Sequence, residues 1–161
     1  MAANPYAVTT VPKLKRSDRR AIAFLSSKED GGIDAKTTFD RLKEKRVREL
    51  RSRFDLWIDG GRCDKYFHGW PNSPRYSSCF VFKWRDKALC HRFYGFLFHP
   101  KPNSNARFQI CILVSHALKT TWETDERDLD GSIALMGNPL VIAAIKKEFS
   151  DKKEERVLWT N

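Results

Sequence analysis

Three stretches in the second half of the chain alternate between side-chain types as half-buried β-strands do. They are CFVFKW (79–84), HRFYGFLFH (91–99) and FQICILVSH (108–116), and the segments between them, RDKALC and PKPNSNAR, have the composition of turns. We therefore predict three consecutive strands in an antiparallel meander. Because alternate residues share a side of a strand, the predicted sides are Phe80, Phe82 and Trp84; Arg92, Tyr94, Phe96 and Phe98; and Phe108, Ile110, Ile112, Val114 and His116.

The first third of the chain has helix signals. SDRRAIAFLSSKED (17–30) begins with Ser17 as a candidate N-cap and ends before a glycine pair, which predicts a first short helix. From Asp34 to Ile58 apolar residues recur mostly at helical spacing until Gly60 and Gly61, which predicts a longer helix. The two helices form a predicted hairpin whose basic outer side holds Lys43, Arg46, Arg51 and Arg53.

Two further helices are predicted after the strands. ETDERDLDGSIALMG predicts a short helix that is broken near Gly137. NPLVIAAIKKEF predicts a second one, with Asn138 as cap and Pro139 in the first turn. Its predicted buried stripe consists of Leu140, Ile145 and Phe149.

These elements predict an α+β fold with an N-terminal helical hairpin, a three- to four-stranded antiparallel sheet and a C-terminal helix. The 161 residues divide into an extended lead-in (1–16), a single α+β domain (17–150) and a polar C-terminal tail (151–161). No apolar run is long enough for a membrane-spanning helix, and the first residues lack the apolar centre of a secretory signal. We therefore expect a cytoplasmic protein with no membrane partner.

The formal net charge is +10, and residues 1–53 contribute 14 basic against 7 acidic residues. An excess of this size favours a polyanionic partner such as RNA, or an acidic protein. A solvated basic surface is the competing interpretation. The four cysteines contain no closely spaced pair, so we expect reduced thiols, with Cys79, Cys90 and Cys111 buried in strands, and no metal or other cofactor.

The last predicted strand leads directly into SHALKTTWETDERDL, in which His116 and Lys119 precede a cluster of acids. With the order helix, helix, three strands and helix, this junction resembles the RelE/HigB superfamily of small toxins, in the phage-derived HigB-like branch. That branch has His-Gly-Phe-x-Lys-Lys-Thr-x-Lys-Thr-Pro where this chain has residues 116–125. Thr120 and Glu123 stand where the branch has two further lysines, and Asp125 where it has proline.

The resemblance implies a compact α+β endoribonuclease that cleaves mRNA, often on the ribosome, without a metal ion, and that a small antitoxin holds inactive. In such a reaction the ribose 2′-hydroxyl attacks the neighbouring phosphate, which requires a base, an acid and cations. His116, Lys119, Arg92 and Tyr94 are the candidate catalytic residues, with His116 as acid or base and the two cations as phosphate ligands. We expect the first three to meet at one edge of the sheet.

Other residues are candidates for RNA binding. The loop FHGWPNSPRY combines rings with cations, a mixture that suits single-stranded RNA. The complete candidate set is Tyr66, His68, Trp70 and Arg75 from this loop region, Arg107 near the third strand, and Arg46, Arg51 and Arg53 from the hairpin. The competing interpretation is that the loop aromatics pack on the sheet, because 13 of the 20 aromatic residues lie between residues 54 and 99 and indicate a core.

The five acids at 123, 125, 126, 128 and 130 are unfavourable beside an RNA site. We expect Thr124 to cap the following helix, with the acids near its positive end. Three functions stay open: a toxin-like nuclease; a non-catalytic basic module of the same fold that binds RNA, the ribosome or a protein; and a structural or protein-interaction protein of phage type, whose basic N-terminal third meets an acidic antitoxin or coat component.

Overall fold

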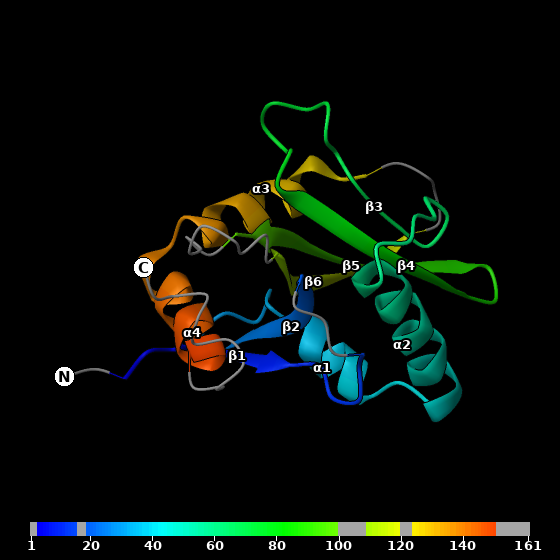
Figure 1. Ribbon diagram of the computed structural model, residues 1–161, viewed down its shortest axis with the longest axis horizontal. Helices are drawn as coiled ribbons and strands as arrows, with labels where there is room; N and C mark the ends of the chain where they lie inside the picture. Colours follow the sequence, from blue (N-terminus) through cyan, green and yellow to red (C-terminus); the bar gives the residue numbers. More distant parts are fainter. Residues whose placement is uncertain (1–2, 16–18, 100–108, 120–123, 151–161) are drawn as a thin grey trace.

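The computed structural model describes residues 3–15, 19–99, 109–119 and 124–150. They form a six-stranded mixed sheet in the order β1-β2-β6-β5-β4-β3, with four helices (Figure 1). The elements, in chain order, are β1 (Tyr6–Thr10), β2 (Arg20–Ser27), α1 (Ala35–Asp40), α2 (Glu44–Ile58), β3 (Phe67–Gly69), β4 (Cys79–Asp86), β5 (Leu89–Phe98), β6 (Gln109–Lys119), α3 (Glu126–Met136) and α4 (Pro139–Ser150). The predicted α+β class is confirmed.

The central part of the sheet is the predicted meander. β4 pairs antiparallel with β5, and β5 pairs antiparallel with β6. Phe80, Phe82 and Trp84 lie on one side of β4 in one core cluster, as their alternation predicts. Apolar alternation therefore identified these strands correctly.

The prediction for the N-terminal third is wrong in one element. Residues 20–27 form β2 and not a helix, and they lie between β1, to which they are antiparallel, and β6, to which they are parallel. The apolar run Ile22–Leu25 is buried on both faces of the sheet, so it has no alternation that would separate it from a helix. The lead-in holds β1, and the short β3 completes the opposite edge, which makes the sheet larger than predicted and mixed.

Helices cover both faces of the sheet (Figure 1). The first face, here called the α2 face, packs Phe24, Phe82 and Phe93 against α1 and α2, with Phe54 and Leu50 in between. The second, here called the α3 face, has two clusters: one with the α4 side chains and one with Leu129 of α3. The clusters hold 33 buried apolar residues, so the core is divided by the sheet into two layers.

The predicted helix from Asp34 to Ile58 is two helices, because the chain leaves helical geometry between Asp40 and Glu44. α4 begins as predicted: the side chain of Asn138 accepts a hydrogen bond from the backbone N–H of Leu140 at 2.9 Å. Leu140 itself is 48 % exposed, so the buried stripe is Val141, Ala144, Ile145 and Phe149. The side chain that caps α3 belongs to Asp125, which accepts from the N–H of Arg127, and not to Thr124.

A β-bulge divides β6 into two parts with opposite alternation. Tyr94 pairs with Ser115, but the next residue of β5, Gly95, pairs with Leu113, so Val114 is an extra residue on β6. Ile110, Ile112 and Val114 face α4, as alternation predicts. Beyond the bulge the alternation is reversed, and His116 pairs with Phe93 on the α2 face. The prediction that His116 shares a side with these apolar residues is therefore wrong.

Candidate functional site

Cationic side chains gather on the α3 face at one end of the sheet. On β4, Lys83 and Arg85 alternate with Phe82 and Trp84, which pack on the α2 face. Lys83 pairs with Arg92 across β4 and β5, while Cys90 pairs with Arg85 on one side and with Lys119 on the other. Directly paired residues of neighbouring strands point to the same face. Lys83, Arg85, Arg92 and Lys119, here called the cationic face, therefore lie together.

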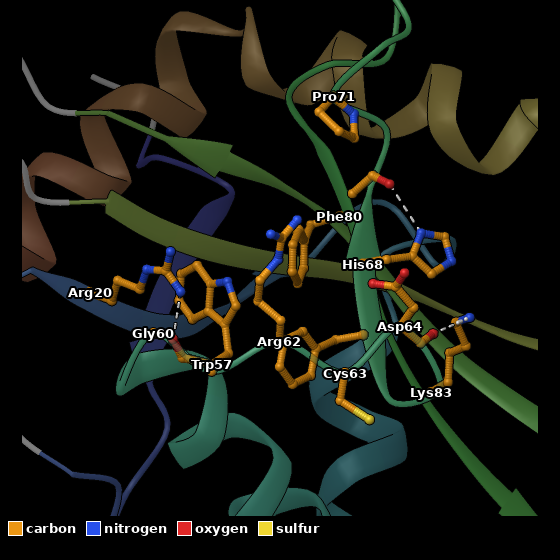
Figure 2. A pocket seen from close by; sticks show the side chains of 13 residues that line it. Arg20, Trp57, Gly60, Arg62, Cys63, Asp64, His68, Pro71, Phe80 and Lys83 are labelled. Atoms are coloured by element: carbon orange, nitrogen blue, oxygen red, sulfur yellow. Dashed lines mark hydrogen bonds between the residues drawn. The ribbon is translucent and has the colours of Figure 1, made fainter.

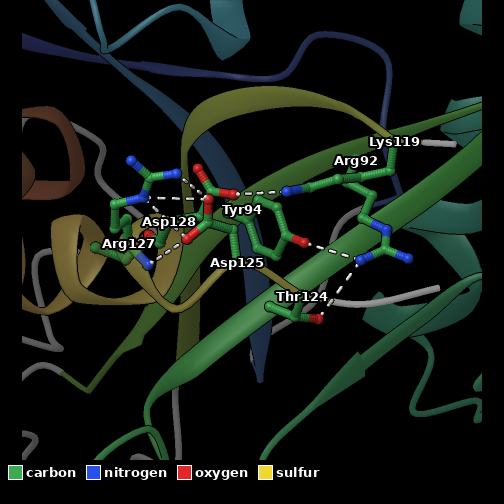
Figure 3. A network of polar contacts seen from close by, with 8 residues as sticks. Arg92, Tyr94, Lys119, Thr124, Asp125, Arg127 and Asp128 are labelled. Atoms are coloured by element: carbon green, nitrogen blue, oxygen red, sulfur yellow. Dashed lines mark hydrogen bonds and ion pairs between the residues drawn. The ribbon is translucent and has the colours of Figure 1, made fainter. Parts of the chain in front are cut away.

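Arg92 is the buried member of the cationic face, with only 5 % of its surface exposed. Its Nη1 donates to the hydroxyl of Tyr94 at 3.0 Å and lies 3.5 Å from Oγ1 of Thr124 (Figure 3). Tyr94 is fully buried. Arg92 and Tyr94 thus share a side of β5, as their alternation predicts, and their contact places a positive charge beneath the surface in a medium where screening by water is weak.

Lys119 lies at the surface of the cationic face beside one acid. Its Nζ is 3.5 Å from Oδ2 of Asp128, and the two side chains are 19 % and 28 % exposed. The neighbouring acids point elsewhere: Asp125 caps α3 and pairs with Arg127, and Asp130 pairs with Arg75 at 2.7 Å. Asp125 and Asp130 thus bind within α3 or its neighbours, Asp128 alone among the described acids has an ion pair with the cationic face, and Glu123 lies outside the described residues.

His68, on β3, lies on the same face as Lys83. It pairs with Val81, which is two residues before Lys83 on β4. Its Nδ1 is 3.0 Å from the carbonyl oxygen of Gly69 (Figure 2). Because a carbonyl only accepts, Nδ1 carries the proton and Nε2 has the free lone pair. Burial lowers the pKa of His68, and the charges of Lys83 and Arg92 lower it further, so the imidazole is neutral near pH 7.

Lys83 has an environment that also favours loss of its proton. Its Nζ donates to the backbone carbonyl of Asp64 at 3.0 Å. Burial lowers the pKa of Lys83, and the charge of Arg92 lowers it further. A histidine that is neutral near pH 7 and a lysine with a lowered pKa on one face are groups that can accept and donate a proton.

An aromatic ring adjoins these groups. The indole of Trp70 is 4.8 Å from the His68 ring in an edge-to-face arrangement and 6.5 Å from the Tyr94 ring in a nearly parallel one. Trp70 is half-buried, so part of the ring stays accessible. Two of the four predicted loop residues, His68 and Trp70, therefore lie beside Arg92, Tyr94 and the rest of the cationic face.

His116 is not part of this arrangement. It lies on the α2 face, where its Nε2 is 2.9 Å from Nδ1 of His91 and its ring stacks near Trp84. Its backbone N–H donates to Asp34. Burial lowers the pKa of His116, and the adjacent His91 adds to that effect. The expectation that His116 meets Arg92 and Lys119 is wrong, because the bulge at Val114 turns its side chain to the opposite face.

The predicted basic outer side of the hairpin is wrong for its central arginines. Arg46 pairs with Glu49 at 2.7 Å and with Asp86 at 3.2 Å. Arg53 donates to the carbonyl oxygen of Lys83 at 2.5 Å, pairs with Glu49, and lies 4.1 Å over the ring of Tyr66. These side chains attach α2 to β4, and Arg51 is half-buried. Arg107 lies outside the described residues.

Sequence reasoning missed Lys83, Arg85 and His91. The signal for the first two was present: in CFVFKWRD the cations alternate with Phe82 and Trp84, so they had to share the face opposite to these rings. Cys90, expected to be buried, is half-buried, whereas Cys79 and Cys111 are buried as expected.

Within the described ranges, no group of three or more His, Cys, Asp or Glu side chains is placed to hold a metal ion. No single helix of these ranges is both long and apolar enough to cross a membrane, although α3 and α4, which meet at a bend of 71°, reach that length and composition together.

Comparisons with protein-family models, with curated proteins and with solved structures each found no match for this chain. The likeness to RelE/HigB toxins therefore stays a prediction from the sequence. What the described residues provide is a neutral imidazole, several cations and an indole on one face of one sheet. This combination can bind a phosphodiester backbone and stack an unpaired base.

Proposed function

We propose that this chain is a toxin-like, metal-independent endoribonuclease of the RelE/HigB type, which binds single-stranded mRNA on the cationic face. The observation that carries the proposal is that Lys83, Arg85, Arg92 and Lys119 share one face of the sheet with His68. This site replaces the one expected from sequence, in which His116 was the acid or base.

Phosphate binding is the first requirement, and the charges support it. Lys83, Arg85 and Lys119 reach the surface, while Arg92 adds a buried positive charge beneath them. Positive groups that neutralise phosphates supply most of the affinity of a protein for a nucleic acid. Trp70, next to His68, offers an indole on which an unpaired base can stack.

The reaction needs a proton acceptor and a proton donor. Neutral His68 takes the proton of the ribose 2′-hydroxyl through Nε2, and the 2′-oxygen forms a bond to the neighbouring phosphorus. The bond from phosphorus to the 5′-oxygen breaks, and the ammonium of Lys83 protonates this leaving oxygen. The products are a 2′,3′-cyclic phosphate and a 5′-hydroxyl. Arg92 and Lys119 stabilise the added negative charge on the phosphate in the transition state.

The order of the elements agrees with the resemblance only from residue 34 onward. The first helix of the predicted order, residues 17–30, is replaced by β2, and α1 and α2 both come from the second predicted helix. The antiparallel meander β4-β5-β6 followed by a helix is the part of the order that supports the proposal. A small antitoxin-like partner with an acidic surface would complement the cationic face, and the ribosome would present the mRNA.

A second candidate is a non-catalytic module of the same fold that binds RNA, the ribosome or a protein. The burial of Arg92 and Tyr94 favours it, because a side chain that is 5 % or 0 % exposed does not touch RNA directly. The ion pair of Lys119 with Asp128 favours it too, since that contact reduces the charge available to phosphate.

Cleavage of a labelled oligoribonucleotide in the presence of EDTA tests the proposal. We expect a 2′,3′-cyclic phosphate product, and no product from a substrate with a single 2′-deoxy substitution at the cleaved position. His68→Asn should abolish cleavage, because an amide can still donate to the Gly69 carbonyl but cannot accept the proton. His116→Asn, on the opposite face, is the matched control and should retain cleavage. The same proteins should be assayed on ribosome-bound mRNA and for growth arrest when expressed alone.

The possible outcomes separate the two candidates. Cleavage that survives in His68→Asn but is lost in His116→Asn would overturn the site proposed here. If no variant and no wild-type preparation cleaves RNA, whereas binding is sensitive to salt and to Lys83→Met, the non-catalytic candidate is correct. RNA binding that ignores both salt and Lys83→Met would refute the cationic face as an RNA site in both candidates and would favour a protein partner.

A further inference from the structure

A cleft beside β3 adjoins the cationic face and shares His68 and Lys83 with the proposed site, and its remaining residues have no role in the chemistry described above. It has a volume of about 750 Å³. Figure 2 shows Arg20 and Trp57 at one end, His68, Asp64 and Lys83 at the other, and Arg62 between them. Clefts of this size are typical of sites for small molecules or single groups of a larger ligand.

The turn after α2 shapes one wall of the cleft. Gly60 has φ 87°, a left-handed conformation that favours glycine. A side chain on Gly61 would lie 2.4 Å from Leu56, so the turn packs tightly against α2. Arg20 closes the end of the cleft, because its Nη1 donates to the backbone carbonyl of Trp57 at 2.6 Å and its guanidinium lies 4.6 Å from the indole centre. The cleft is thus a fixed feature of the fold.

The lining favours an anion that carries an apolar or aromatic part. Arg20, Arg62 and Lys83 oppose one carboxylate, that of Asp64, which leaves an excess of two positive charges. His68 adds no charge near pH 7, because burial lowers its pKa. The walls between these groups include the rings of Trp57 and Phe80. A nucleotide has this combination of a charged phosphate and a flat, mostly apolar base.

Two residues belong both to the cleft and to the proposed RNA site. His68 and Lys83 line the cleft and lie on the α3 face, and β3, which separates the two regions, is an edge strand of only three residues. An RNA strand on the cationic face reaches the cleft by passing around this short edge.

We propose that the cleft is a subsite for a nucleotide of single-stranded RNA that flanks the segment bound on the cationic face. This inference rests on the proposed RNA binding there. Arg62, which is exposed, binds the phosphate of the flanking nucleotide, and Arg20 and Lys83 supply the remaining positive charge at the two ends of the cleft.

The test compares oligonucleotides of two lengths that cannot be cleaved. We would measure fluorescence anisotropy with labelled 2′-O-methyl oligouridylates of about three and about eight nucleotides, since single-stranded sites span roughly 4–16 nucleotides. Arg62→Gln should weaken binding of the longer probe about fivefold and flatten its salt slope by about 0.7, without affecting the shorter one. Arg85→Gln, in the cationic face, should weaken both. Arg48→Gln, an exposed change of equal charge on α2, is the matched control.

The rate at which Cys63 reacts with a maleimide reports directly on whether the cleft is occupied. Cys63 lines it and is half-buried, whereas Cys79 and Cys111 are buried, so Cys90→Ser leaves Cys63 as the accessible thiol. The longer probe should slow the reaction of Cys63 with a maleimide, and the shorter one should not.

The two proposals fail in different ways. The subsite is refuted if Arg62→Gln and Arg48→Gln have the same affinities, if Arg62→Gln weakens binding of both probes equally, or if the longer probe leaves Cys63 reactive. In each of these cases, a loss of affinity in Arg85→Gln still upholds RNA binding at the cationic face. If Arg85→Gln changes neither affinity, the proposed function is refuted as well.

Discussion

Asp128 is the acid that lowers the charge of the cationic face, and its removal tests the proposed site directly. Its carboxylate is 3.5 Å from Nζ of Lys119, with both side chains more than two-thirds buried. Asp128→Asn releases Lys119 to bind a phosphate and removes a negative charge that repels RNA. We therefore expect the variant to bind single-stranded RNA more tightly than the wild type.

The size of the effect follows from the number of phosphate contacts. Each contact with single-stranded nucleic acid contributes about −0.7 to the slope of log affinity against log salt. One restored contact raises the affinity about fivefold at about 0.1 M salt and about threefold at about 0.2 M. The folded state loses roughly 1 kcal/mol at most, because an isolated and partly exposed ion pair contributes little to stability.

The assay is a salt titration of affinity for a 2′-O-methyl oligonucleotide, which binds but is not cleaved. Asp130→Asn is the matched control, because it removes the same charge from the same helix but belongs to a pair with Arg75. A double variant, Asp128→Asn with Lys119→Met, isolates the contact. If Asp130→Asn gives the same gain, or if the gain persists without Lys119, the effect is one of net charge and the reasoning is refuted.

Three further predictions concern the fold that supports the site. Gly95→Ala should lower the free energy of unfolding by about 3 kcal/mol in urea denaturation, because its Cβ would lie 1.8 Å from a carbonyl oxygen of β6. The control Gly131→Ala in α3, whose Cβ would have nothing within 4 Å, should stabilise the protein by up to about 1 kcal/mol. Equal effects of the two substitutions would contradict the close packing at Gly95. Arg53→Met should lower the free energy of unfolding by about 2 kcal/mol in the same measurement, because the guanidinium of Arg53 donates to the backbone carbonyl of Lys83. The control Arg48→Met, at an exposed position, should change it little. An Arg53→Met protein as stable as the wild type would show that this contact is dispensable. Burial lowers the folded-state pKa of three imidazoles, those of His68, His91 and His116, so the unfolded chain binds protons more readily than the folded one. The free energy of unfolding, measured by urea denaturation at several pH values, should therefore fall as the pH drops below about 6.5. Replacement of any of the three by Asn should reduce the slope of stability against pH.

The sequence predicted those parts of the fold whose signals are local. Alternation identified β4, β5 and β6, and Asn138 with Pro139 marked the start of α4. β2 was missed because a strand buried on both faces has an uninterrupted apolar run, which periodicity does not distinguish from a helix. Its identity depends on pairing with β6, which is distant in sequence.

The candidate site was predicted in part, for a related reason. Arg92, Tyr94, Lys119, His68 and Trp70 were all proposed from the sequence, and they lie on one face. His116 was misplaced because a single extra residue in β6 reverses every later side chain, and nothing in ICILVSH marks which residue is extra. The ion pairs of the hairpin arginines could not be predicted from the sequence either, because Arg46 contacts Glu49 and Asp86 only in the folded protein.

The parallel pairing of β2 with β6 has a consequence for synthesis. Ile22 lies beside Cys111, so the middle of the sheet joins an early segment to one that follows more than half of the chain later. During translation the early strands stay without their neighbour until the ribosome has made and released the later one. Contacts of such long sequence separation slow the final step of folding. The edge of β2 that β6 covers in the folded protein therefore stays unpaired in the nascent chain until Gln109–Lys119 have been made.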